Sequence, residues 1–206
     1  MKGIKMQKKA KKVNVVVFDF DGTLSAGDAN VEFGKYCLRH SLRTWAFVPV
    51  ILVAYIGRLI NHPGIWWRQT MRRFLTAGMR DKFARDFIKL HKLNRFGWAA
   101  ERVVAERAAG NIVILISASP DYLLRPLVRD IKFDAVMCSE MEKDYPWKYK
   151  FLCWGKNKVD ALNAWAESKK ITPHIVRSYS DSKSDMPIMK LADETVWINR
   201  KTGCRK

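Results

Sequence analysis

Two aspartates, Asp19 and Asp21, follow directly on the β-branched and apolar residues 13–18, and Gly22 and Thr23 come next. A short run of this composition is typical of a fully buried strand. Gly22 allows a sharp turn at the carboxyl end of that strand, where open α/β sheets place their sites. Because two neighbouring carboxylates repel each other, we expect a cation between them.

Polar residues also follow two later apolar runs. The elements in chain order are Ser117-Ala118-Ser119 after residues 111–116, the lysines Lys156 and Lys158, and Ser180-Asp181 with Asp185 after residues 175–179. The carboxyl ends of parallel strands meet at one edge of a sheet. We therefore expect these residues to form one site with Asp19 and Asp21.

From residue 97 onward the chain alternates between helical and strand patterns. Helices are predicted at 97–109, 121–129 and 158–166, and strands at 111–116, 135–138, 175–179 and 195–198. This alternation predicts an α/β fold, with a parallel sheet that carries helices on both faces. Four scattered cysteines without a Cys-x-x-Cys pair indicate neither a disulfide framework nor a zinc site, which suits a reducing compartment.

Taken together, the four motifs resemble those of the haloacid dehalogenase superfamily of phosphohydrolases, and the resemblance covers nearly the whole chain. It implies a Rossmann-like core made of residues 13–24 and 97–206. A helical cap, residues 25–96, is inserted after the first strand, and residues 1–12 form a basic tail.

The resemblance also implies roles for the acids. Asp19 attacks phosphorus and carries an aspartyl-phosphate, while Asp21 protonates the leaving oxygen and later deprotonates water. Mg²⁺ offsets the repulsion between Asp19 and the phosphate. Its expected ligands are Asp19, the backbone carbonyl of Asp21, and Asp181, with Asp185 beside them as support.

Phosphate and substrate contacts are predicted for five further residues. Ser117 donates to a phosphate oxygen, aided by backbone N–H groups of Ala118 and Ser119 at the start of the next helix. For Ser119 itself we favour a plain helix N-cap over direct catalysis. Thr23 lies beside the phosphate. Asp28 occupies the position, nine residues after the nucleophile, where soluble phosphoserine phosphatases carry a glutamate for the substrate's amine.

A lysine completes the expected phosphate clamp. Lys158, followed by an apolar residue, fits the family's Gly-x-x-Lys pattern, whereas some phosphoserine phosphatases place this lysine where Lys156 stands. We favour Lys158 and keep Lys156 as the alternative.

The predicted cap is basic and partly apolar. Residues 33–80 contain no acid and eight lysines or arginines, and residues 45–60 carry a single charge. A helix of that length spans roughly 24 Å, short of a bilayer's hydrocarbon core of about 30 Å. Together with the amphipathic residues 65–75 it predicts a hairpin, residues 45–75, that lies in a membrane interface. The alternative is that this hairpin forms the cap's own core.

Net charge and the cap together guide the choice of substrate. The formal charge of +18 favours an anionic partner, either nucleic acid or an acidic membrane surface. The cap and motifs are similar to bacterial phosphatidylglycerophosphate phosphatases of the C type. This similarity implies dephosphorylation of phosphatidylglycerol phosphate by a cytoplasmic enzyme, bound peripherally to the inner membrane. The alternative is a soluble phosphatase for a small phosphomonoester such as phosphoserine. A nucleic-acid-binding role is disfavoured, because every catalytic residue type is present.

Overall fold

A computed structural model of the chain describes residues 11–45, 48–49, 52, 77–91, 94–142 and 148–206. Its core is a six-stranded sheet in the order β4-β3-β2-β1-β5-β6. The strands are β1 (Lys11–Phe18), β2 (Ile112–Pro120), β3 (Ala135–Met141), β4 (Tyr149–Phe151), β5 (Ile171–Ser180) and β6 (Glu194–Trp197). All neighbouring pairs are parallel except β3 and β4, so the edge strand β4 is an antiparallel addition to the predicted sheet.

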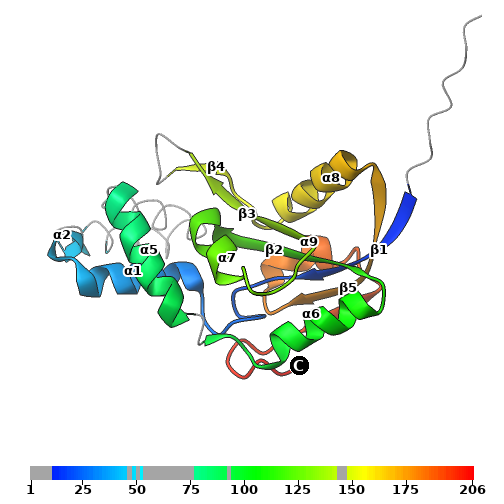
Figure 1. The fold of residues 1–206 in the computed structure, drawn as a ribbon, viewed down its shortest axis with the longest axis horizontal. Coiled ribbons are helices and arrows are strands. Elements are labelled where there is room, and N and C mark those ends of the chain that lie inside the picture. The colour runs from blue at the N-terminus through cyan, green and yellow to red at the C-terminus, as the bar shows by residue number, and fades with distance from the viewer. Residues whose placement is uncertain (1–10, 46–47, 50–51, 53–76, 92–93, 143–147) are drawn as a thin grey trace, which may run out of the picture.

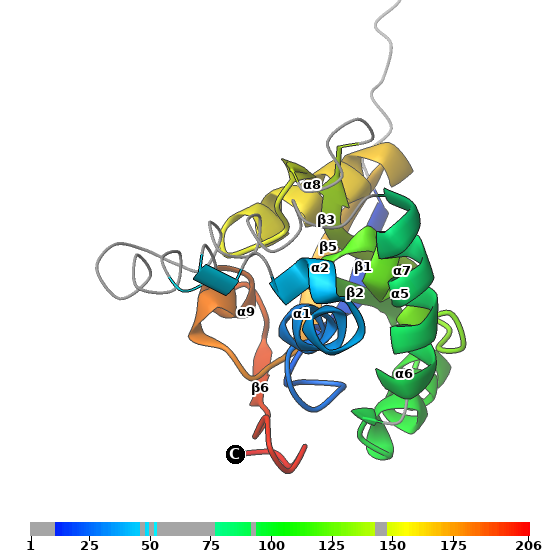
Figure 2. The ribbon, with the colours of Figure 1, turned by 90° about the vertical axis from the view of Figure 1, so that its left-hand side faces the viewer.

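Helices cover both faces of the sheet, which confirms the predicted α/β class (Figure 1; Figure 2). One face carries α6 (Trp98–Ala108) and α7 (Asp121–Leu127). The other carries α8 (Asn157–Lys169) and the short α9 (Met186–Met189), which follows the 3₁₀ turn η2 (Lys183–Asp185).

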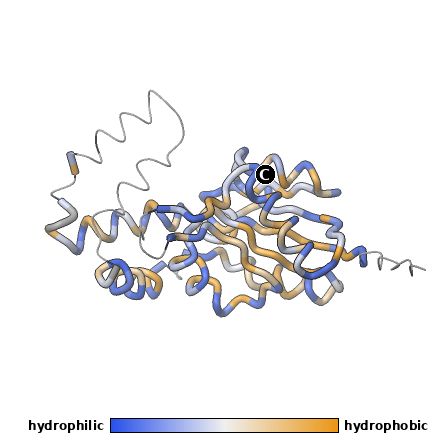
Figure 3. Tube along the Cα trace, turned by 90° about the horizontal axis from the view of Figure 1, so that it is seen from above, coloured by the Kyte–Doolittle hydropathy of each residue, from blue (hydrophilic) through white to orange (hydrophobic). Residues whose placement is uncertain are grey.

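The central strand β1 is apolar on both sides because it is buried on both sides. Val16 and Phe18 belong to the hydrophobic cluster under α6 and α7. Val15 and Val17 belong to the cluster under α8. Hydrophobic residues accordingly concentrate along the central strands (Figure 3).

Three described helices of the inserted region lie beyond one end of the sheet: α1 (Ala29–His40), α2 (Leu42–Trp45) and α5 (Ala77–His91) (Figure 1). Phe33 of α1 and Phe87 of α5 share a small core with Leu123 of α7. These helices are therefore joined to the sheet and its covering helices by side-chain packing as well as by the chain itself.

Most of the predicted membrane hairpin, residues 45–75, lies outside the described residues, as do residues 1–10 of the basic tail. Strand β1 begins at Lys11, two residues before the strand predicted from the sequence. Among the residues that the structure describes, no helix is long and apolar enough to cross a bilayer.

Candidate active site

Strand register brings the predicted residues to one edge of the sheet. Phe18, the last residue of β1, pairs with Leu115 of β2 on one side and with Tyr179 of β5 on the other. The residues that follow these partners are therefore neighbours of Asp19. Its own N–H donates to the carbonyl of Tyr179 at 3.0 Å, which fixes the start of the loop after β1.

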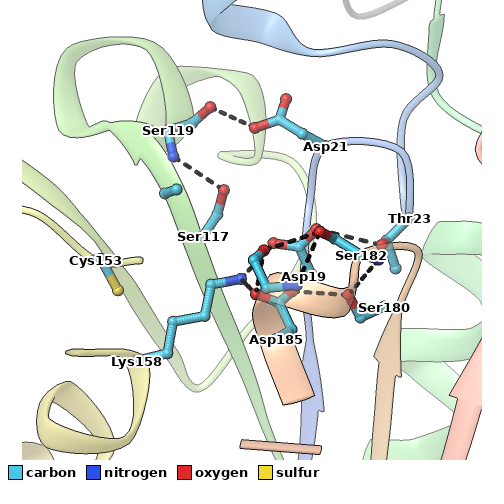
Figure 4. Close-up of polar contacts among 12 residues, drawn as sticks. Asp19, Asp21, Thr23, Ser117, Ser119, Cys153, Lys158, Ser180, Ser182 and Asp185 are labelled. Atoms are coloured by element: carbon cyan, nitrogen blue, oxygen red, sulfur yellow. Dashed lines mark hydrogen bonds and ion pairs between the residues drawn. The ribbon is translucent and has the colours of Figure 1, made fainter. Parts of the chain in front are cut away.

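A buried ion cluster lies at the centre of this edge (Figure 4). The Lys158 ammonium group lies 2.8 Å from Oδ1 of Asp19 and 2.7 Å from Oδ1 of Asp185. Lys158 and Asp185 are each 2% exposed, and Asp19 is 7% exposed. Ser180 donates to the other oxygen of Asp185 at 2.7 Å. The cluster thus joins the ends of β1 and β5 to the first turn of α8.

Thr23 connects the two acidic loops. Its hydroxyl donates to Oδ2 of Asp19 at 3.3 Å and accepts the backbone N–H of Asp181 at 3.0 Å. Gly22, with φ +78°, brings the backbone under Asp181: a Cβ added to this glycine would stand 2.7 Å from the Asp181 carboxyl carbon. The Asp181 carboxylate therefore lies directly against the turn that carries Asp19 and Asp21.

Burial and crowding of acids dominate the electrostatics. Burial, followed by the charges of Asp185 and Asp21, raises the pKa of Asp19 to about 8, while Lys158 opposes this shift. Burial alone would lower the pKa of Lys158, but its two carboxylate partners raise it above the ordinary lysine value. Burial likewise raises the pKa of Asp181, against the effect of Arg200. The site therefore favours an added positive charge.

Asp21 is held apart from that cluster, on the side of Ser119 (Figure 4). Ser119 donates its hydroxyl to Oδ2 of Asp21 at 2.5 Å, and the N–H of Ala29 donates to Oδ1 at 2.7 Å. The expectation that Ser119 caps a helix is wrong, because the N-cap of α7 is Pro120 and the Ser119 side chain is turned to Asp21. The N-cap role of a polar side chain requires that it face its own helix.

The remaining predicted substrate residues line the same cavity. Ser117 accepts the N–H of Ser119 at 3.1 Å through its hydroxyl oxygen, which leaves the hydroxyl hydrogen to donate. Ala118 lines the cavity as well. Asp28 does so while capping α1, where it accepts the N–H groups of Asn30 and Val31. The Asp28 carboxylate therefore both caps α1 and lines the cavity.

The cavity itself has a volume of about 180 Å³. Its lining includes five aspartates, Lys158, Arg200 and Trp154. Lys156 is exposed and is absent from this lining, whereas Lys158 lines the cavity beside Asp19. A larger cavity of about 660 Å³ between α6 and β6 contains none of the predicted residues. Cavity size alone does not identify the active site here.

Sequence reasoning did not single out Trp154 and Arg200. Arg200 follows β6 and places its Nε 3.4 Å from Oδ2 of Asp181. Trp154 precedes the Gly155 turn and is 39% exposed. Neither belongs to a strand-end motif. A cysteine–tryptophan–glycine run before the lysines was the only available signal for Trp154, and no signal pointed to Arg200.

The donor chemistry of this edge suits a hard divalent cation. Carboxylate oxygens are the ligands that Mg²⁺ prefers, and the lining acids outnumber the lining bases. Among the described residues, no three His, Cys, Asp or Glu side chains already stand together in an arrangement that could hold a metal ion. Asp19 and Asp181 both line this cavity and could supply carboxylate oxygens to such an ion.

Comparison with known proteins gives a family. Residues 16–190 match the model of the haloacid dehalogenase-like hydrolases. A probable phosphatase of Mycobacterium tuberculosis strain H37Rv is 27% identical over 200 residues, which cover 92% of this chain and 70% of that protein.

Solved structures match the fold over nearly the whole chain. A protein of unknown function from Bordetella pertussis Tohama I superposes with a TM-score of 0.76 at 17% identity, covering 92% of this chain and 91% of that one. A phosphoserine phosphatase with an analogue of the phospho-aspartyl intermediate gives 0.67 at 16%, covering 93% and 88%. At these identities the likeness concerns the fold.

Proposed function

Since this chain belongs to the haloacid dehalogenase-like hydrolase family, we propose that it is a phosphatase that hydrolyses phosphomonoesters through a phosphate carried on Asp19. One observation carries the proposal: the buried Asp19 carboxylate lies between the Lys158 ammonium and the Thr23 hydroxyl. The related mycobacterial protein, named as a probable phosphatase, supports the same activity.

In the first step an oxygen of Asp19 forms a bond to phosphorus while the bond from phosphorus to the leaving oxygen breaks. Asp21 gives its proton to that oxygen, so the alcohol leaves neutral. In the second step water attacks phosphorus, the bond to Asp19 breaks, and Asp21 takes a proton from the water. Phosphate is released and both carboxyl groups return to their starting states.

Binding of the phosphoryl group uses fixed donors. Lys158 places positive charge beside Asp19, and the Ser117 hydroxyl is free to donate to a phosphoryl oxygen. Asp19, the carbonyl of Asp21 and Asp181 would hold Mg²⁺, with Asp185 in support. That ion would supply the charge neutralisation that lets an anionic carboxylate approach an anionic phosphate.

For the substrate, the comparisons support a small soluble phosphomonoester. Phosphoserine phosphatases share the fold across nearly the whole chain, including a substrate-bound complex with a TM-score of 0.64. The cavity of about 180 Å³ suits a phosphoryl group with few further atoms. The rest of the substrate would lie under the cap.

An anionic phospholipid, phosphatidylglycerol phosphate, is the second candidate. It is supported by the apolar side chains exposed just before and at the start of residues 45–75, Leu42 at 89% and Trp45 at 59% exposure. A peripheral position on the cytoplasmic face of the inner membrane would follow from this substrate and from the chain's charge of +18.

An assay of phosphate release in the presence of Mg²⁺ tests both the phosphatase activity and the choice of substrate. Wild-type protein and its Asp19→Asn variant are compared on phosphoserine, on other soluble monoesters, and on phosphatidylglycerol phosphate in mixed micelles. Turnover that depends on Asp19 supports the phosphatase, and the preferred ester selects between the candidates. Wild-type protein without activity on any monoester would contradict the proposal.

A further inference from the structure

The contacts of Asp21 come from two different parts of the molecule. Ser119 belongs to β2 of the sheet domain, and Ala29 is the first residue of the cap helix α1. Their donor atoms lie 2.5 and 2.7 Å from the two oxygens of one carboxylate. A carboxylate that accepts a hydrogen bond at each of its two oxygens has little freedom to rotate.

Both donors are themselves fixed. Ser119 is 2% exposed, and its N–H is tied to Ser117 at 3.1 Å. Ala29 is fully buried, and the Asp28 cap holds the first turn of α1. A proton donor contributes fully only when it is held in the geometry that the reaction needs.

Resting on the proposed function, we infer that Ser119 is a positioning residue for the acid–base group Asp21, acting jointly with the Ala29 N–H of the cap. In this role the Ser119 side chain acts through Asp21, and Ser119 is not among the residues that line the cavity. Its loss should therefore weaken the steps that need proton transfer and spare those that do not.

Two esters separate these steps. Phosphoserine has an alkoxide leaving group that needs a proton, whereas p-nitrophenolate departs as a stable anion. The ratio kcat/KM covers binding up to departure of the leaving group. We expect Ser119→Ala to lower kcat/KM about tenfold for phosphoserine, a part of the contribution of a general acid. For p-nitrophenyl phosphate we expect a change below about twofold on the same grounds.

A double-mutant cycle gives a second readout that a structural role would not produce. In protein that already carries Asp21→Asn, the further change Ser119→Ala should have no effect on kcat/KM for phosphoserine, because the group it positions is gone. Ser168→Ala, an exposed serine on α8, is the matched control and should leave both esters unaffected.

Ala29→Pro tests the cap's contribution. Proline lacks the N–H and is well tolerated at the first position of a helix. Asp28 has φ −126° and ψ 110°, a conformation that a following proline accepts. We expect the same selective loss on phosphoserine, with α1 retained by circular dichroism.

The outcomes are distinct. Equal losses on both esters, or losses that add in the Asp21→Asn protein, would overturn the inference and leave the phosphatase proposal standing. A wild type that hydrolyses no phosphomonoester at all would overturn the proposed function, and this inference with it.

Discussion

The ammonium group of Lys158 lies 2.8 Å from Oδ1 of Asp19, and both side chains are almost fully buried. The pair joins the first turn of α8 to the end of the central strand. The same ammonium group lies 2.7 Å from Oδ1 of Asp185. Removing the lysine would leave two carboxylates facing each other without a counter-charge.

Lys158→Met should therefore affect both stability and activity. Breaking a buried ion pair by removing one partner costs about 3–5 kcal/mol, and urea unfolding measures this loss. Phosphatase activity should fall by roughly 10²-fold or more, as for other groups that stabilise developing charge. Lys156→Met, at an exposed position two residues away, is the control and should change stability by less than about 0.5 kcal/mol. Equal effects of the two changes would contradict the clamp assignment.

Thr23→Val tests the link between the two acidic loops. Valine keeps the shape but cannot accept the Asp181 N–H or donate to Asp19. A buried donor left without a partner costs about 1–3 kcal/mol, so the urea midpoint should fall. Thr23→Ser retains the hydroxyl and should lose less. If valine proved as stable as threonine, the link would have no role in holding the loops together.

Gly22→Ala tests how closely the turn approaches Asp181. The position has φ +78°, and a Cβ there would stand 2.7 Å from the Asp181 carboxyl carbon. The left-handed backbone alone costs about 1–2 kcal/mol for a residue with a side chain. We expect loss of stability and a higher Mg²⁺ concentration for half-maximal activity, because the added Cβ would displace the Asp181 carboxylate. Gly78→Ala, in α5 with nothing within 4 Å, should be neutral or slightly stabilising; similar losses in both variants would refute the contact.

Sequence patterns predicted this site well where a rule ties position to topology. Parallel strands end at the same edge, so the sequence alone assigns Asp19, Ser117 and Asp181 to one site. Side-chain direction does not follow from that rule. Ser119 looked like a cap because a proline and a helix follow it, yet its hydroxyl donates to Asp21, 98 residues earlier in the chain. Arg200 belongs to no repeating pattern, so only the folded chain places it beside Asp181.

The antiparallel strand β4 was missed for a related reason. It has three residues, Tyr149–Phe151, and lies at the edge of the sheet beside β3. A segment that short carries no readable alternation of apolar and polar residues. The longer strands β2 and β5 were located correctly but extend further than their apolar centres, because β5 already pairs with β1 from Ile171 and β2 still pairs with β3 at Pro120.

Thiol reactivity gives a pH-dependent prediction. Burial raises the pKa of Cys37 and Cys153 to about 12 and that of Cys138 to about 11. Only the thiolate is alkylated, so at pH 8 these three thiols should stay protonated and unmodified in the native protein. Cys204 is exposed and should react. Mass spectrometry after iodoacetamide treatment should show one adduct in native protein and four in denaturant. Modification of a buried thiol at pH 8 would contradict the packing around it.

The most direct test of the account is to find the phosphate on Asp19. The protein is mixed with a radiolabelled phosphomonoester and Mg²⁺, quenched in acid and digested with trypsin. The label should appear on the peptide of residues 13–35, be released by hydroxylamine as expected for an acyl phosphate, and be absent in Asp19→Asn. Asp21→Asn should retain it longer, because hydrolysis of the intermediate needs that base. Turnover without a labelled peptide, or a label that persists in Asp19→Asn, would contradict the assignment of Asp19 as nucleophile.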